Sequence, residues 1–253
     1  MADERRVGAA LVVIGNEVLS GRTRDANTQF IGAQLNELGI RLGEVRIIAD
    51  TCDAIIEAVN ALRVRNDYVF TTGGIGPTHD DITAQCIAQA FGVALVCDPG
   101  AVALLKRHYG PERFNDSRKR MAYVPEGAML IDNPVSAAPG FQIENVYVMA
   151  GIPRIMQAMF KGIAHRLSGG KPLLSITIAT DLGEGMLAAD LGRLQDEFSE
   201  VEIGSYPSTA QGRMGVRLVL RSTDPKTLAA AGKACRAMVL GLGGEARELD
   251  YTA

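Results

Sequence analysis

TTGGIGPTHDDIT, residues 71–83, lies between the apolar run Tyr68-Val69-Phe70 and a segment with helical periodicity. This order predicts a strand, a glycine-rich turn and the start of a helix. Three glycines in four positions let the backbone adopt positive φ and approach another group closely. The unpaired N–H groups and partial positive charge of a helix start favour an anion, for which phosphate is the usual occupant. We therefore predict a phosphate site formed by Gly73, Gly74 and Gly76.

Two adjacent carboxylates, Asp80 and Asp81, follow the glycines. We expect one of them to cap the helix, which leaves the other free for chemistry. Mg²⁺ is typically held by few carboxylates together with substrate phosphates. Asp50 and Glu17 are expected to lie near Asp80 and Asp81, and this group of carboxylates suggests a divalent metal such as Mg²⁺, which would polarise a phosphoryl group or activate water. Asp80 and Glu17 would support this group, and capping of the following helix is the alternative for Asp50.

Strands and helices alternate around this stretch. Buried apolar runs predict strands at residues 7–14, 42–49, 68–72, 93–96, 128–131 and 146–150, and helical periodicity predicts helices at 25–38, 52–64, 81–91, 101–109 and 153–167, with a loop over 133–141. This alternation indicates right-handed βαβ units with helices on both faces of a mostly parallel sheet. Because ligands of such sheets bind beyond the carboxyl ends of the strands, the loop 15–21, Asp50 and the glycine turn are expected to converge there.

A second, shorter pattern follows the stretch Ser168-Gly169-Gly170-Lys171-Pro172, which predicts a domain boundary. It consists of predicted strands at 173–179, 201–206 and 215–220 and helices at 185–198 and 225–240, with a loop over 208–214. We expect one domain at residues 1–168 and another at 172–253. The second would be a small α+β domain, large enough to carry its own core.

The composition is that of an ordinary globular protein, with 47% hydrophobic and 22% charged residues. A net charge of -3 and the absence of tryptophan argue against a nucleic-acid partner. No apolar run could span a bilayer and the charged start does not resemble a signal peptide, so we expect no membrane partner and a cytoplasmic location. The four cysteines, Cys52, Cys86, Cys97 and Cys235, are expected to be buried free thiols.

Polar residues in three other segments are candidates for ligand binding. Lys119 lies in the basic run Arg118-Lys119-Arg120, which could clamp a phosphate; a solvated helix face is the alternative. Ser20 and Ser136 lie in loops of small residues and could donate hydrogen bonds to a ligand. Ordinary turn chemistry is the alternative for both serines.

Four stretches together resemble the competence/damage-inducible protein A (CinA) family: residues 14–21, 71–83, 133–141 and 151–153. The resemblance covers the family's amino-terminal molybdopterin-binding-like domain, and residues 203–207 are similar to its small middle domain. It implies a three-layer α/β/α fold with a pocket at the carboxyl ends of the strands. It also implies that Asp81 and Asp50 are the catalytic acids and the residues that would hold the metal. Combined with the residues above, it gives the candidate ligand-binding set Gly15, Glu17, Ser20, Gly73, Gly74, Gly76, Asp80, Lys119, Ser136, Pro139, Gly140 and Gly151.

The resemblance implies metal-dependent hydrolysis of a nucleotide pyrophosphate such as ADP-ribose. An alternative is a pterin-binding protein of the molybdenum-cofactor type, whose pocket would hold molybdopterin or a pterin nucleotide. A third is an inactive oligomeric homologue, because Ile155 stands where the family carries an acid. We expect a homo-oligomer in each case. Full-length members often carry a carboxy-terminal deamidase domain that these 253 residues lack, so deamidation is not expected.

Overall fold

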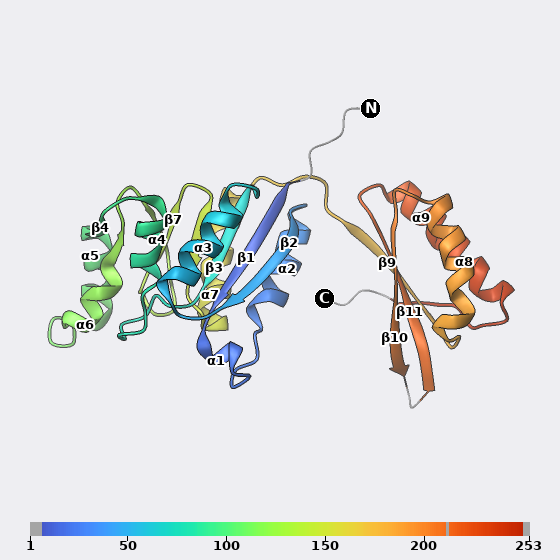
Figure 1. The fold of residues 1–253 in the computed structure, drawn as a ribbon, viewed down its shortest axis with the longest axis horizontal. Coiled ribbons are helices and arrows are strands. Elements are labelled where there is room, and N and C mark those ends of the chain that lie inside the picture. Colours follow the sequence, from blue (N-terminus) through green and yellow to red (C-terminus); the bar gives the residue numbers. More distant parts are fainter. Residues whose placement is uncertain (1–6, 211–212, 250–253) are drawn as a thin grey trace. The chain divides into compact units, whose positions relative to one another are not determined.

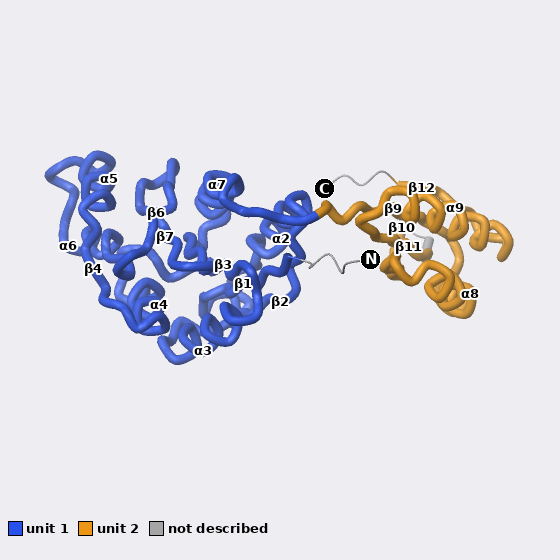
Figure 2. Tube along the Cα trace, turned by 90° about the horizontal axis from the view of Figure 1, so that it is seen from above, with its two compact units in different colours: residues 1–170 blue, residues 171–253 orange. Residues whose placement is uncertain are grey.

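The structure is a computed structural model that describes residues 7–210 and 213–249. The chain divides into two compact units, Met1–Gly170 and Lys171–Ala253 (Figure 2). Each unit has its own hydrophobic core, so the two are described separately. Within the described ranges, no helix is long and apolar enough to cross a membrane.

A six-stranded sheet with the order β2-β1-β3-β8-β7-β6 forms the centre of unit 1. Its strands are β1 (Gly8–Ile14), β2 (Arg41–Ile48), β3 (Tyr68–Thr72), β6 (Met129–Ile131), β7 (Gly140–Ile143) and β8 (Val146–Met149). The pairs β2–β1, β1–β3 and β3–β8 are parallel, whereas β8–β7 and β7–β6 are antiparallel. The predicted mostly parallel sheet is confirmed. The loop predicted over residues 133–141 is shorter than expected, because β7 begins at Gly140.

Helices cover both faces of this sheet and produce the three layers (Figure 1). α3 (Cys52–Arg63) and α4 (Thr83–Phe91) pack on one face, and α2 (Asn27–Glu37) and α7 (Pro153–Ile163) pack on the other. Successive residues of β1 alternate between the two cores, since Val12 belongs to the first and Leu11 to the second. Burial on both faces explains why this strand is continuously apolar and not alternating.

A small substructure lies beside the sheet in unit 1. β4 (Leu95–Cys97) and β5 (Tyr123–Pro125) form a separate antiparallel pair, so the strand predicted at residues 93–96 does not join the main sheet. α5 (Pro99–Tyr109) and α6 (Asp116–Lys119) accompany this pair. The buried residues Ala101, Leu105, Met121 and Ala122 form its core.

Unit 2 is a four-stranded antiparallel sheet with the order β10-β11-β9-β12. Its elements are β9 (Leu174–Thr180), α8 (Glu184–Glu197), β10 (Glu202–Ala210), β11 (Arg213–Ser222), α9 (Pro225–Gly241) and β12 (Arg247–Leu249). Both helices pack on one face of the sheet (Figure 1). The predicted α+β class is confirmed. The loop predicted over 208–214 is wrong at both ends, where β10 and β11 pair, and residues 211–212 lie outside the described residues.

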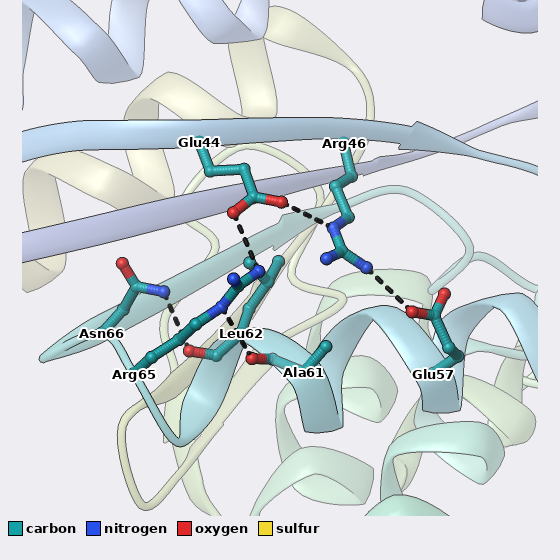
Figure 3. Close-up of polar contacts among 7 residues, drawn as sticks. All are labelled: Glu44, Arg46, Glu57, Ala61, Leu62, Arg65 and Asn66. Carbon is teal, nitrogen blue, oxygen red and sulfur yellow. Dashed lines mark hydrogen bonds and ion pairs between the residues drawn. The ribbon is translucent and has the colours of Figure 1, made fainter.

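Charged side chains connect the edge strand β2 to α3 (Figure 3). Arg46 Nε lies 2.8 Å from Glu44 Oε1, and Arg46 Nη1 lies 3.0 Å from Glu57 Oε1. Arg65 Nη2 extends the row, at 2.9 Å from Glu44 Oε2. The hydrogen bond from Arg46, and the positive charges of both arginines, lower the pKa of Glu44 below its usual value. Charges at this position also hinder pairing of the exposed sheet edge with another chain.

Two of the four cysteines form a disulfide between helices. Cys52 at the start of α3 is bonded to Cys86 in α4, and their Cα atoms lie 5.2 Å apart. The prediction of free thiols is therefore wrong for this pair, because packing of the helices joins residues separated by 34 positions. Cys97 and Cys235 are free, and burial raises the pKa of the Cys235 thiol to about 11.

We predict that Glu44→Gln lowers stability more at pH 7 than at pH 3. The folded-state pKa of Glu44 is lowered, so its stabilising effect is complete above the unfolded value of about 4.3 and is lost as the pH falls through the folded value. Calorimetric unfolding at both pH values measures the difference. Glu112→Gln is the control, since no ion pair of Glu112 occurs in the described part of the chain. A loss of stability from Glu44→Gln that is as large at pH 3 as at pH 7 would contradict the assignment of this stability to the ion pairs of Glu44.

We also predict that protein purified without reductant has one readily alkylated cysteine, Cys97. Cys235 should react only after unfolding, because it is fully buried and its raised pKa disfavours the reactive thiolate. Peptide mapping after iodoacetamide treatment should find Cys52 and Cys86 in one crosslinked species. Alkylation of Cys52 before any reductant is added would show that the pair is not bonded.

Candidate functional site

Hydrogen bonds join the loops that follow β1 and β2 at the carboxyl edge of the sheet. Gly15 N donates to Ile48 O at 3.1 Å. Asn16 N, in the short helix α1 (Asn16–Leu19), donates to Asp50 Oδ2 at 2.7 Å. The residue at the cap position of α3 is Thr51, so the capping alternative for Asp50 is wrong. Its carboxylate instead fixes the loop after β1 against the loop after β2.

Gly73 determines how closely three backbone segments approach one another. It has φ +111°, and a Cβ atom there would lie 2.1 Å from the carbonyl oxygen of Ile14. Its N–H donates to Met149 O at 3.1 Å. A Cβ on Gly151 would lie 3.3 Å from Gly73 Cα. Gly73 and Gly151 therefore shape the site through close packing of the backbone.

Thr83, the first residue of α4, holds the glycine loop in place. Its fully buried side chain donates from Oγ1 to Gly73 O at 3.0 Å. Its N–H donates to Gly74 O, also at 3.0 Å. Gly74 has φ +65°, and a Cβ atom there would lie 2.2 Å from Thr83 Oγ1. These contacts leave room for hydrogen only at both glycines.

Three successive N–H groups of this loop have no partner. Among the described residues, the N–H groups of Gly74, Ile75 and Gly76 donate no hydrogen bond. The same three residues line a cavity of about 140 Å³, whose walls also include Asp81, Ala84, Gln85, Arg120, Tyr123, Pro139 and Phe141. Successive unpaired N–H groups form a concavity that binds anions. The loop is therefore arranged as an anion cradle.

Asp81 closes the turn that follows the cradle. Its Oδ2 accepts hydrogen bonds from Thr78 N at 2.8 Å and from Thr78 Oγ1 at 2.7 Å. The cap position of α4 is Ile82, without a side-chain hydrogen bond. The prediction that an aspartate caps this helix is therefore wrong, because Asp81 is engaged by the preceding turn.

Asp80 shares the Thr78 hydroxyl with Asp81. A hydroxyl carries one hydrogen, so it satisfies only one of the two carboxylates at a time. The hydrogen bond from Thr78 is the main cause that lowers the pKa of Asp80. Two carboxylates therefore stand beside the cradle with fewer donors than they can use.

Arg120 brings a positive charge to the cavity wall; the sequence prediction included it in the basic run 118–120 but selected Lys119 as the binding residue. It follows α6 directly and lines the cavity, whereas Lys119 is exposed and absent from the cavity wall. Arg118 instead places its guanidinium carbon 4.2 Å from the centre of the Tyr109 ring. The turn at the end of α6 decides which cation faces the cavity, and the order of the three basic residues does not show it. Ligand binding by Lys119 stays a prediction.

The other predicted binding residues have structural partners. Ser20 Oγ donates to Glu17 O at 3.2 Å, and Ser136 Oγ accepts from Asn133 Nδ2 at 2.7 Å. A Cβ on Gly140 would lie 2.2 Å from a backbone oxygen of β8. These contacts hold the loops that border the site. Pro139 lines the cavity and Glu17 lines a second, smaller one.

The described residues contain no cluster of three or more His, Cys, Asp or Glu side chains placed to hold a metal ion. A Mg²⁺ ion held by one or two carboxylates and the phosphates of a ligand needs no such cluster. Asp81 lies at the cavity, while one oxygen of Asp50 is engaged by Asn16. Asp50 lines neither of the two cavities, so of the two predicted metal-binding acids only Asp81 is placed to share a cation with an anionic ligand there.

These features define an α/β protein with an anion cradle at the carboxyl ends of a mostly parallel sheet. Residues 10–169 match the family described as "Probable molybdopterin binding domain", and residues 172–241 match "FAD synthase, middle domain". Because the first match spans more than half of the 253 residues, the chain belongs to the family of molybdopterin-binding-like domains, in its CinA-like branch.

Individual relatives agree with this assignment. A CinA-like protein of Salinibacter ruber is 35% identical over 88% of this chain, which spans 56% of that relative's length. Protein TK1472 of Thermococcus kodakarensis is 35% identical over 79% of this chain and 85% of its own length. The crystal structure of a CinA protein with unknown function from Thermoplasma acidophilum is 33% identical, with a TM-score of 0.61 over 64% of this chain and 98% of that one. The resemblance to the CinA family is thereby confirmed.

We predict that Gly73→Ala destabilises unit 1 by about 2 kcal/mol or more, because the added Cβ meets a backbone oxygen and φ is positive. Thermal unfolding followed by circular dichroism measures the change. Gly162→Ala in α7 is the matched control, since nothing lies within 4 Å of its Cβ, and it should stabilise by about 0.5–1 kcal/mol. Equal unfolding midpoints for the two variants would contradict the close-packing role of Gly73.

Proposed function

We propose that the protein is a metal-dependent pyrophosphatase that hydrolyses a nucleotide pyrophosphate of the ADP-ribose type. The observation that carries the proposal is the row of unpaired N–H groups at Gly74, Ile75 and Gly76, in one cavity with Asp81. Phosphate oxygens are natural acceptors for such groups. Arg120 on the same wall supports a second phosphate, since a guanidinium can bind two oxygens at once.

The size of the cavity supports a partly enclosed ligand. Pockets that hold whole small molecules usually measure about 300–1,000 Å³. The cavity measures about 140 Å³, so it would take the phosphates and an adjoining group. The remainder of a dinucleotide-sized ligand would extend beyond it.

Asp81 is the acid proposed to act at the phosphates. Thr78 orients its carboxylate through two hydrogen bonds to Oδ2, which leaves Oδ1 for a cation or a water molecule. A bound Mg²⁺ would polarise the phosphoryl group or activate water. Asp50 is the proposed second acid, with Oδ2 engaged by Asn16 and Oδ1 available.

A second candidate is binding of molybdopterin or a pterin nucleotide. The family description, a probable molybdopterin binding domain, favours it. The same cradle would accept the phosphate of such a ligand, so the two candidates differ in whether a bond is broken. Self-association, expected in either case, stays a prediction.

We predict that Asp81→Asn lowers hydrolysis of ADP-ribose by about 100-fold or more, because the amide cannot supply the negative charge that holds a cation or accepts a proton. Asparagine can still accept the hydrogen bond from Thr78 N, so the turn should persist. Release of AMP with Mg²⁺, Mn²⁺ or Zn²⁺, measured by chromatography, tests it. Asp116→Asn, an exposed acid outside both cavities, is the matched control.

The outcomes separate the two candidates. Folded wild-type protein that releases no AMP with any of these metals would exclude the hydrolase. Calorimetric titration with molybdopterin would then decide the pterin-binding alternative. Full turnover by Asp81→Asn, with AMP as the product, would remove Asp81 from the chemistry and leave the activity standing.

A further inference from the structure

A second cavity lies on the other face of the sheet, next to the amino end of α2. It measures about 50 Å³, and its polar walls are Glu17, Thr23, Arg24, Asp25, Asn27 and Thr72. Thr71 and Thr72 are adjacent in β3, so their side chains point to opposite faces. Thr72 directly precedes the glycine loop, which places this cavity immediately beside the anion cradle.

Two buried side chains of this cavity carry polar atoms without a partner. Asn27 is 5% exposed and Thr72 is 1% exposed, and in the part of the chain that the structure describes neither Asn27 Oδ1 nor Thr72 Oγ1 has a hydrogen bond. An unpaired buried polar atom costs about 1–3 kcal/mol. Two such atoms in one cavity indicate that a bound group completes their hydrogen bonds.

The hydrogen bonding of Asn27 determines which of its atoms faces the cavity. Its Nδ2 donates to Gly151 O at 2.8 Å. A carbonyl oxygen only accepts, so the nitrogen must face Gly151 and the oxygen must be the unpaired atom. The missing partner of Asn27 is therefore an O–H or N–H donor.

The charged walls of this cavity, two carboxylates and one guanidinium, favour a neutral group over an anion. The Asp25 carboxylate accepts from Asn27 N at 2.9 Å and from Thr28 N at 3.3 Å, and so supports the start of α2. Glu17 and Arg24 are exposed at the rim. Two carboxylates would repel a phosphate here, whereas a neutral hydroxyl can donate to Asn27 Oδ1 and exchange a hydrogen bond with Thr72 Oγ1.

We propose that this cavity binds the hydroxyl groups of a sugar in the ligand whose phosphates occupy the Gly74–Gly76 cradle. Its volume accommodates roughly three water-sized groups, which suits hydroxyls and excludes a nucleobase. Thr72 and Gly74 are two residues apart, at most about 7 Å of extended chain, so one sugar phosphate reaches both. The proposal rests on the proposed function only in taking a phosphorylated sugar as the ligand.

The test compares Thr72→Val with Thr71→Val. Thr71 is a matched control because it is fully buried, its Oγ1 is also unpaired, and it lines neither cavity. Neither substitution removes a hydrogen bond within the protein, so both variants should fold, which thermal unfolding verifies. Affinities for inorganic phosphate and for ribose 5-phosphate, measured by calorimetry, report on the cradle alone and on both sites.

Thr72→Val should lower the affinity for ribose 5-phosphate about 10-fold and leave the affinity for inorganic phosphate unchanged. Thr71→Val should change neither affinity. A crystal of the complex should show the sugar hydroxyls at Asn27 Oδ1. Equal affinities of the two variants for ribose 5-phosphate, or water alone in the cavity, would overturn the proposal. So would wild-type protein that binds ribose 5-phosphate no better than phosphate. A selective Thr72 effect without AMP release would sink the proposed hydrolysis and leave the sugar site standing.

Discussion

The close approach of Gly73 to the carbonyl oxygen of Ile14 is the constraint on which the site depends. No side chain fits at Gly73, so β1, β3 and the loop after β8 meet backbone against backbone. Thr83 then fixes the conformation of the loop through two hydrogen bonds. Its Oγ1 donates to the carbonyl oxygen of Gly73, and its N–H donates to the carbonyl oxygen of Gly74. Among the described residues, the N–H groups of Gly74, Ile75 and Gly76 donate no hydrogen bond, so they stay available for an anion in the cavity that these residues line.

Unpaired polar groups gather around this constraint on both faces of the sheet. The N–H groups of Gly74–Gly76 lie on the α4 side, and Asn27 Oδ1 and Thr72 Oγ1 lie on the α2 side. Folded proteins satisfy nearly all buried polar groups, so the two buried atoms, Asn27 Oδ1 and Thr72 Oγ1, require a bound partner, whereas Gly74–Gly76 are partly exposed. On the α4 side the unpaired groups are backbone donors beside the Asp81 carboxylate, and on the α2 side they are one carbonyl acceptor and one hydroxyl. That division matches a ligand with an anionic part and a hydroxyl-bearing part.

Local sequence predicted the features that local chemistry determines. The strand β3, the glycine turn and α4 follow from an apolar run, residues that permit positive φ, and helical periodicity. The partner of Asp50 was not predictable, because Asn16 lies 34 positions away in the sequence. Two local features were also missed, because they depend on turn geometry: Asp81 accepts from Thr78 and does not cap α4, and Arg120 lines the cavity whereas Lys119 does not. The role of Asn27 is the extreme case, since only its bond to Gly151, 124 residues away, identifies its free atom as an acceptor.

The disulfide between α3 and α4 links two helices that border the site. Cys52 follows Asp50 by two positions and Cys86 follows Thr83 by three, so the crosslink joins the two helices whose amino ends carry the proposed acids and the cradle. Closing a loop across 34 positions stabilises a fold by about 3–4 kcal/mol through the unfolded chain. That is comparable to the cost of a few unpaired polar groups, at about 1–3 kcal/mol each. The disulfide therefore contributes stability of the same order as the cost of leaving the two buried atoms, Asn27 Oδ1 and Thr72 Oγ1, without a partner.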